Sequence, residues 1–245
     1  QQMISLGERN EGYLAKVGEP LIQFYGYKTC GVWNSAEEIA ANPHFSDDAP
    51  GGIRIVDTNN DGSLTPEDRV ALGTPYPDFT WGITNTFQIK DFDISFLIQG
   101  VQGITVLNGD VYYNETKKWN KKYTKNRWVS AEHPGDGKTP YQNVKTGHDI
   151  MLTDYPLQNA SYACLRNFTV GYTLPATAAR KIKLSGVRFY VSGSNLFYIW
   201  GSGYKGINPE SRMTSGDYSS AMISGYQRGG FPLTSTISAG FDINF

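Results

Sequence analysis

Apolar and polar residues alternate with a period of two in several separate windows of the chain. In residues 79–89 every odd position except Asn85 is apolar, and every even position is polar or glycine. The alternation returns at 92–99, 167–174, 187–199 and 236–245, and less cleanly in an aromatic run at 23–28. Because successive side chains of a strand point to opposite faces, the pattern predicts six β-strands with one apolar and one polar face each.

The connections between these windows alternate in length. Residues 90–91 and 175–185 make short connections, whereas 34–77, 108–160 and 201–232 are long and polar. Loops beyond about 15 residues are uncommon inside compact domains. Short turns at one end and long loops at the other are typical of outer-membrane barrels.

Strand length separates a membrane barrel from a soluble β-sandwich, whose strands also alternate. The 79–89 run is long enough to cross the hydrocarbon at a tilt, which takes about 9–11 residues, whereas sandwich strands average about 5–6. The apolar faces carry aromatic residues near the strand ends, as interfacial girdles do. The predicted fold class is therefore all-β, an antiparallel transmembrane β-barrel with long extracellular loops.

Six strands are too few to close a barrel. Single-chain bacterial barrels begin at about eight strands, and an open edge in lipid would leave backbone groups unpaired. The chain opens on Gln1 and Gln2 instead of a leader, and it ends on Phe245, which shares the apolar stripe of the last strand and resembles an outer-membrane assembly signal. We therefore expect residues 1–245 to be the C-terminal part of a larger barrel.

Composition narrows the functional classes. The 245 residues include 27 Gly and 16 Tyr, a mixture that suits β-structure. The formal net charge of -1 argues against wholesale binding of nucleic acid. The mean hydropathy of -0.41, without an apolar run near twenty residues, excludes a spanning helix. It does not exclude a barrel, whose apolar band is hidden in the alternation.

A series of short motifs resembles the SusC/RagA family of TonB-dependent outer-membrane transporters. The resemblance covers nearly the whole chain in order. The motifs are Val17-Gly18-Glu19-Pro20-Leu21, Phe24-Tyr25-Gly26-Tyr27-Lys28-Thr29, Asp57-Thr58-Asn59-Asn60-Asp61-Gly62, Pro77-Asp78-Phe79-Thr80-Trp81-Gly82, Leu165-Arg166-Asn167, Gly171-Tyr172-Thr173-Leu174-Pro175 and Ser194-Asn195-Leu196-Phe197.

This resemblance implies a 22-stranded barrel with an N-terminal plug, in the outer membrane and in contact with its lipids and lipopolysaccharide. It implies two partners, a SusD-like surface lipoprotein and the TonB complex, and import of glycans, oligosaccharides or peptides without enzymatic activity. The plug and most strands are absent from this chain, so we expect that the chain alone does not transport.

Residues 57–68 are a candidate calcium loop. Oxygen-bearing side chains stand at positions 1, 3, 5, 9 and 12, with Gly62 at position 6 for the sharp turn and the Ser63 carbonyl at position 7. The predicted ligands are Asp57, Asn59, Asp61, Ser63, Thr65 and Asp68. The alternative is an Asn/Asp/Gly turn that needs no metal. Any such ion would stiffen an extracellular loop.

Two groups of loop residues are candidates for binding. A basic segment combines cations with aromatic rings, as single-stranded nucleic acid or an anionic glycan requires; the near-zero net charge favours a solvated outer loop instead. Its residues are Lys117, Lys118, Trp119, Lys121, Lys122, Tyr123, Lys125, Arg127 and Trp128. Aromatic residues that stack on sugars or pack their own loops are Tyr112, Tyr113, Trp119, Trp200, Tyr204, Tyr218 and Tyr226.

The remaining chemistry is sparse. Cys30 and Cys164 form one disulfide or remain two free thiols, and His44, His133 and His148 are expected to be exposed loop residues. No GxSxG, HExxH or phosphate-binding glycine loop is present. The alternative to a transporter is a secreted, calcium-stabilised, carbohydrate-binding β-sandwich. A glycan-cleaving enzyme ranks third, because no carboxylate pair is singled out.

Overall fold

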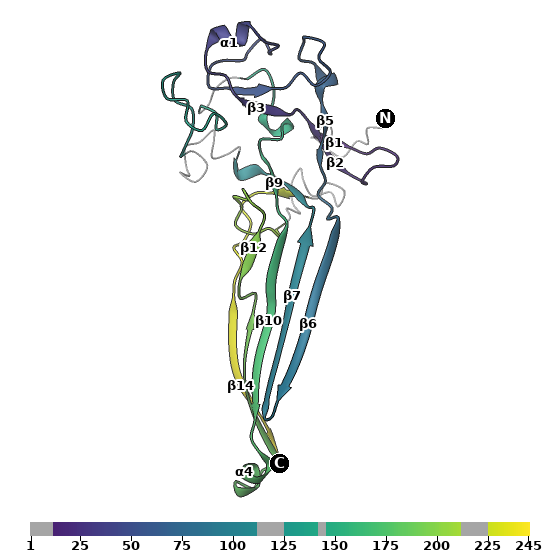
Figure 1. Ribbon diagram of the computed structural model, residues 1–245, viewed down its shortest axis with the longest axis vertical. Coiled ribbons are helices and arrows are strands. Elements are labelled where there is room, and N and C mark those ends of the chain that lie inside the picture. The colour runs from purple at the N-terminus through teal and green to yellow at the C-terminus, as the bar shows by residue number, and fades with distance from the viewer. Residues whose placement is uncertain (1–11, 112–124, 142–145, 212–224) are drawn as a thin grey trace.

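The computed structural model describes residues 12–111, 125–141, 146–211 and 225–245. It has two parts, a tall twisted sheet and a layer of folded loops at one end of that sheet (Figure 1). The C-terminus and a short helix lie at the opposite end. Among the described residues no helix combines the length and the apolar character needed to cross a membrane.

Short strands come first along the chain, and from residue 79 onward long strands alternate with further short ones. The elements are β1 (Tyr13–Leu14), β2 (Gln23–Gly26), β3 (Thr29–Val32), α1 (Ala36–Ala40), β4 (Ile53–Ile55), η2 (Pro66–Asp68), β5 (Val70–Gly73), β6 (Phe79–Ile89), β7 (Phe92–Gln102), β8 (Thr105–Asn108), η3 (Ile150–Leu152), β9 (Leu157–Asn159), β10 (Tyr162–Thr173), α4 (Ala176–Lys181), β11 (Gly186–Ser194), β12 (Tyr198–Trp200), β13 (Tyr226–Gln227) and β14 (Thr236–Asn244).

The tall sheet contains all the windows that alternate cleanly. Its order is β14-β11-β10-β7-β6, with β12 beside β10, and every pair is antiparallel. Neighbours in space are therefore successive long strands of the chain. Lys90, at φ 54°, makes the tight turn between β6 and β7, and α4 lies in the short connection to β11. The predicted alternation of short and long connections is confirmed.

The sheet is not closed into a barrel. Within the described residues β6 and β14 are its two edges. The number of strands predicted for the complete barrel, 22, thus stays a prediction.

The loop layer is folded around cores of its own. One buried cluster joins β1, β2, β8, η3 and β13 through Tyr13, Ile22, Phe24, Leu107, Met151 and Tyr226. A second one joins Tyr27 to Ile53 and Ile55. A third cluster, which includes Val106, Tyr162 and Tyr204, lies where the layer meets the tall sheet. The long polar connections therefore form a compact layer, because their scattered apolar residues converge from distant parts of the chain.

Two sequence expectations about strands need correction. Residues 23–26 do form a strand, but β2 pairs with β1 and β5 in the loop layer and adds nothing to the tall sheet. Phe24 packs on Tyr13, and a Cβ at Gly26, two residues on and therefore on the same face, would lie 2.0 Å from the Leu152 carbonyl oxygen, so residues of the loop layer cover this face of the strand. The predicted strand 187–199 is interrupted at Asn195, where φ is 54°, and continues as β12.

Candidate functional site

The strand registers bring the apolar positions of the tall sheet into continuous rows. An aromatic row near the short turns contains Ile89, Phe92, Tyr172, Phe189 and Phe241, one from each strand. The next row contains Phe87, Ile94, Val170, Val191 and Ala239. These side chains are not buried by other elements: Phe87, Phe189 and Phe241 are 48%, 51% and 65% exposed. An apolar face of this breadth marks an interaction surface.

The height of this face matches a bilayer. The 11 residues of β6 rise about 3.3 Å each, which is roughly 36 Å along the strand. At the tilt of about 35–45° found in barrels, the band is about 25–30 Å tall, close to the apolar band of outer-membrane proteins. Trp81 lies at the loop end, packed over Gly100 of β7. Aromatic residues thus flank the band at both ends.

The opposite face is lined by small polar side chains. Its central row carries a hydroxyl group on every strand: Thr86, Ser95, Thr169, Ser192 and Ser238. Such a row is compatible with water and offers donors and acceptors. It has the composition expected of the lumenal side of a barrel.

An ion-pair group crosses the polar face near the short turns. Arg188 of β11 contacts Asp93 of β7 with Nη2 2.6 Å from Oδ2, and Nη1 lies 3.3 Å from Oδ2 of Asp242 on β14. Gly171 of β10 lies between Arg188 and Asp93, and a Cβ there would come within 2.4 Å of the Asp93 carboxylate. The glycine therefore makes room for a contact that joins strands two apart.

A second polar group lies where the sheet meets the loop layer. The β10–β7 register shifts between Leu165 and Asn167, so Arg166 occupies a bulge. Its guanidinium donates to Gln99 (3.3 Å), Asn195 (2.8 Å), Tyr198 (3.0 Å) and Glu210 (2.5 Å). Bulges at barrel rims re-aim side chains in this way. Arg166 ties the loop at Glu210 to the wall of the sheet.

Little in the sequence pattern indicates these two arginine groups. Arg188, Asp242 and Asp93 all occupy polar positions of predicted strands. Opposite charges on one polar face are compatible with an ionic contact between strands. The bulge at Arg166 left no comparable sign, because one extra residue in a strand does not alter composition.

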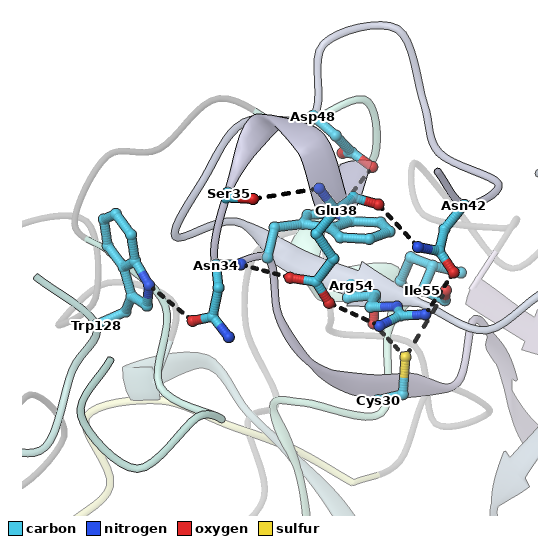
Figure 2. A network of polar contacts seen from close by, with 10 residues as sticks. Cys30, Asn34, Ser35, Glu38, Asn42, Asp48, Arg54, Ile55 and Trp128 are labelled. Carbon is cyan, nitrogen blue, oxygen red and sulfur yellow. Dashed lines mark hydrogen bonds and ion pairs between the residues drawn. The ribbon is translucent and has the colours of Figure 1, made fainter. Parts of the chain in front are cut away.

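The loop layer holds a third polar network, drawn in Figure 2. Glu38 of α1 accepts from the backbone N–H of Asn34 (2.8 Å) and pairs with Nη1 of Arg54 at 2.8 Å. Arg54 also donates to Asn42 and lies over the Trp33 ring at 4.8 Å. Ser35 caps α1 by accepting from the Glu38 N–H. This network holds α1 against the β3–β4 pair.

The candidate calcium loop is organised by its own side chains. Asp57 accepts from the N–H groups of Asp61 and Gly62, and Asn59 and Asp61 bond to each other. Asp61 also accepts from the Ser63 N–H at 2.8 Å.

Asp68 connects the two ends of the candidate calcium loop. It is fully buried and accepts from Thr58 and Thr65 at 2.8 Å each. Among the described residues no group of three or more His, Cys, Asp or Glu side chains is placed to hold a metal ion. Calcium binding stays a prediction from the spacing.

The remaining candidates divide between the loop core and the surface. Trp128 is buried and donates from Nε1 to Asn34, and Tyr204 and Tyr226 are buried in loop clusters, so these three pack their own loops. Trp200 is exposed, as is Lys125, and Arg127 is half-buried. The residues that lie outside the described ranges are Tyr112, Tyr113, Lys117, Lys118, Trp119, Lys121, Lys122, Tyr123 and Tyr218.

The cysteines are free thiols, Cys30 exposed and Cys164 buried. His44 and His133 are exposed as expected, but the expectation for His148 is wrong. Its side chain is 2% exposed, because the Phe45 and Tyr27 rings pack against it. Neither ring nitrogen has a hydrogen-bond partner among the residues that the structure describes.

Comparison with known proteins bears on all of these surfaces. No protein-family model matches the chain. TonB-dependent receptor P26 of Formosa agariphila is 30% identical over 239 residues, which cover 94% of this chain and 23% of the relative. TonB-dependent receptor SusC of Bacteroides thetaiotaomicron is 25% identical over 243 residues, which cover 99% and 21%. The chain spans less than a quarter of the length of these two relatives.

Solved structures show the same fold. The RagAB peptide transporter superposes with a TM-score of 0.69 at 19% identity, over 97% of this chain and 24% of that chain. The RagAB peptide importer in its closed-closed state gives 0.66 at 19% identity. The tall sheet and its loop layer are thus a fold that recurs as part of a larger transporter chain.

Proposed function

We propose that this chain, which belongs to the SusC/RagA-type TonB-dependent receptors, forms part of the wall and outer loops of an outer-membrane nutrient importer. The observation that carries the proposal is the pair of faces on the tall sheet. One face is an exposed apolar band with aromatic rows, and the other is lined by hydroxyl groups and ion pairs. A wall between lipid and a watery lumen requires this pairing.

The chain contributes one sector of this wall, and the rest of the barrel comes from further strands. The free edges at β6 and β14 support this, because strand edges in lipid need partners. We propose that residues 1–245 are the C-terminal sector of a 22-stranded barrel whose plug lies elsewhere in the same protein. Short turns and α4 then face the periplasm, and the loop layer faces the cell exterior.

The proposed cargo is a glycan, an oligosaccharide or a peptide, delivered with a SusD-like surface lipoprotein and energised by TonB. The relatives support the general class, since they are named as TonB-dependent receptors and a peptide importer. We propose transport without catalysis. In this arrangement the loop layer meets the lipoprotein and solute, and the outer face meets lipid and lipopolysaccharide.

The alternative, a secreted carbohydrate-binding β-sandwich, fits the geometry poorly. A sandwich buries the apolar face of one sheet under another. Within the described residues the apolar face of the tall sheet stays open, with Ile237 75% exposed and Ile83 51% exposed. Such a face in water would promote aggregation.

The test uses the intact protein that contains this chain. It should fractionate with the outer membrane, need detergent for extraction, and migrate faster on a gel before heating than after. Cells carrying it should take up labelled peptide or oligosaccharide, and loss of TonB should abolish that uptake. A protein that is soluble and monomeric without detergent would refute the proposal.

A further inference from the structure

A pocket of about 590 Å³ opens in the loop layer, where segments far apart in the sequence meet. Its walls come from Cys30 and Gly31 of β3, from the turn at 136–139, and from Tyr155 and Lys205. Its volume lies within the range of about 300–1,000 Å³ that is typical of small-molecule sites. It is separate from the arginine groups on the tall sheet.

A bulge in β3 shapes one wall of the pocket. Thr29 pairs with Ile55 and Val32 pairs with Ile53, so Cys30 and Gly31 together face the single residue Arg54 on β4. Gly31 has a φ of 116°, and a Cβ there would lie 2.8 Å from the Gly137 carbonyl oxygen. The bulge and the glycine let the 136–139 turn approach β3 closely, and such irregularities often accompany functional sites.

The charged residues that line the pocket are two lysines, Lys138 and Lys205, and one aspartate, Asp136. Asp136 accepts from the backbone N–H groups of Lys138 and Thr139 at 2.9 and 2.7 Å and from the Thr139 hydroxyl. Burial acts to raise the pKa of Asp136, but these donors and the charge of Lys205 outweigh it and keep the pKa below its ordinary value.

Asp136 thus offsets one of the two lysine charges. The Lys138 side chain forms no ion pair with any described residue. The lining itself therefore holds two cations and one anion, and Asp154, which accepts from Thr29 of the wall, adds a carboxylate behind that lining. The unpaired ammonium group of Lys138 is the charge that a small anion can neutralise.

We propose that this pocket binds a carboxylate group of the solute, with Lys138 and Lys205 as its cationic contacts. The inference rests on the proposed function, because it names the class of cargo: an acidic solute, either a uronic-acid oligosaccharide or a peptide carboxylate. An ammonium group attracts a carboxylate as a point charge and does not impose one orientation. The pocket thus recognises the negative charge of the solute, and other surfaces of the protein recognise the shape of the rest of the solute.

The alkylation rate of the Cys30 thiol can report the charge and the occupancy of this pocket. It lines the wall as an exposed thiol, with Sγ 3.7 Å from the Arg54 carbonyl oxygen, and Figure 2 shows it beside Arg54. Burial raises its pKa, as do Glu38 and Asp154, and Arg54 opposes them only in part, so alkylation needs mildly alkaline solution. Cys164 is buried and serves as the internal control for folding.

The first measurement compares two alkylating reagents on the intact protein, with Cys30 and Cys164 quantified by peptide mass spectrometry. The Cys30 thiolate displaces iodide from either reagent. Anionic iodoacetate should react faster relative to neutral iodoacetamide at Cys30 than it does with a small thiol in solution. Lys138→Gln and Lys205→Gln should each lower this ratio several-fold, and added salt should lower it too. Lys90→Gln, at the short turn, should leave it unchanged.

The second measurement is protection of Cys30 from iodoacetamide. Oligogalacturonate or a short acidic peptide should slow alkylation several-fold, whereas neutral galacto-oligosaccharide and the corresponding peptide amide should not. Protection by the glycan alone, by the peptide alone or by both supports the site and identifies the source of the carboxylate. Equal protection by the neutral compounds, no protection at all, or an unchanged reagent ratio in both lysine variants overturns it.

These outcomes are distinguishable from failure of the proposed function. Cys30 protection measures occupancy of the pocket and needs neither TonB nor an energised membrane. Uptake without protection would keep the importer and remove the pocket. Protection without membrane fractionation or uptake would keep the pocket and remove the importer.

Discussion

Arg188 binds Asp93 across an intervening strand, with Nε 2.9 Å from Oδ1 and Nη2 2.6 Å from Oδ2. The contact is a paired, charge-assisted hydrogen bond, which is stronger than a neutral one. It exists only because Gly171 on the strand between them has no side chain. The pair therefore joins β7 to β11 directly.

Replacing that glycine should weaken the sheet. Gly171→Val places its side chain within 2.4–2.6 Å of both charged groups and must displace them. We expect a loss of about 1–3 kcal/mol, as for an overpacked site. Urea titration of the intact protein in detergent, followed by the loss of its fast-migrating unheated form, measures this.

The matched control for Gly171 is Gly82→Val on the same polar face. A Cβ at Gly82 meets nothing closer than 3.8 Å, and valine favours strands. This variant should be as stable as the parent or slightly more so. An equal loss in both variants would mean that the ion pair has no special dependence on Gly171.

Adjacent residues of β11 test which face meets lipid. Val191 lies on the apolar face and is 52% exposed, and Ser192 lies in the hydroxyl row. Val191→Lys should cost about 2–4 kcal/mol, the penalty for lysine near the bilayer midplane, and Ser192→Lys should cost far less. Yields of folded protein in the outer membrane measure the difference. A larger cost for Ser192→Lys than for Val191→Lys would mean that the face with the hydroxyl row meets lipid.

Asp68 should anchor the loop before β5. Burial acts to raise its pKa, but N–H donation from Thr65, Thr58 and Asn59 outweighs this and lowers the pKa below its ordinary value. Asp68→Ala leaves these donors unsatisfied and should lower the local free energy of unfolding by about 3 kcal/mol. Hydrogen exchange of residues 57–69 reports it. Glu67→Ala, at an exposed neighbour, should change exchange little.

The calcium hypothesis has its own test. If the loop at 57–68 binds calcium, the ion should slow hydrogen exchange there, and a chelator should reverse the effect by mass action. Asp57→Ala should abolish the response, because Asp57 is the first predicted ligand. Exchange that is insensitive to calcium in the parent protein would leave a hydrogen-bonded turn that needs no metal.

His148 should make the loop layer sensitive to acid. Burial lowers its pKa, and Asp48, whose Oδ1 is 3.9 Å from Nδ1, and Asp149 oppose this only in part. The unfolded chain then binds the proton more readily than the folded one, so stability is full above the ordinary histidine pKa of about 6.5 and falls as pH drops below it.

The pH experiment compares two histidine variants. His148→Phe should fill the site between Phe45 and Tyr27 and flatten the pH dependence of protease resistance in the loop layer. His44→Phe, at an exposed position, should leave that dependence as it is. If both variants keep the parent's pH profile, another group is responsible.

The sequence by itself determined the tall sheet. The β6 strand runs over residues 79–89 as the alternation predicts, because a period of two over eleven residues fits a β-strand and does not fit a helix. The turn at Lys90, the aromatic rows and the separation of short and long connections follow from the same pattern. The short sequence motifs also indicate the family.

Tertiary structure decided what the local pattern does not encode. Residues 23–26 are a strand in either reading, but only long-range partners, β1 and β5, place them in the loop layer. The bulge at Arg166, the burial of His148 and the pocket beside Cys30 likewise depend on contacts between segments that are distant in the sequence. Thr29 and Asp154, which meet beside that pocket, are 125 residues apart. Such contacts depend on how separate loops pack, whereas alternation records only the two faces of one strand.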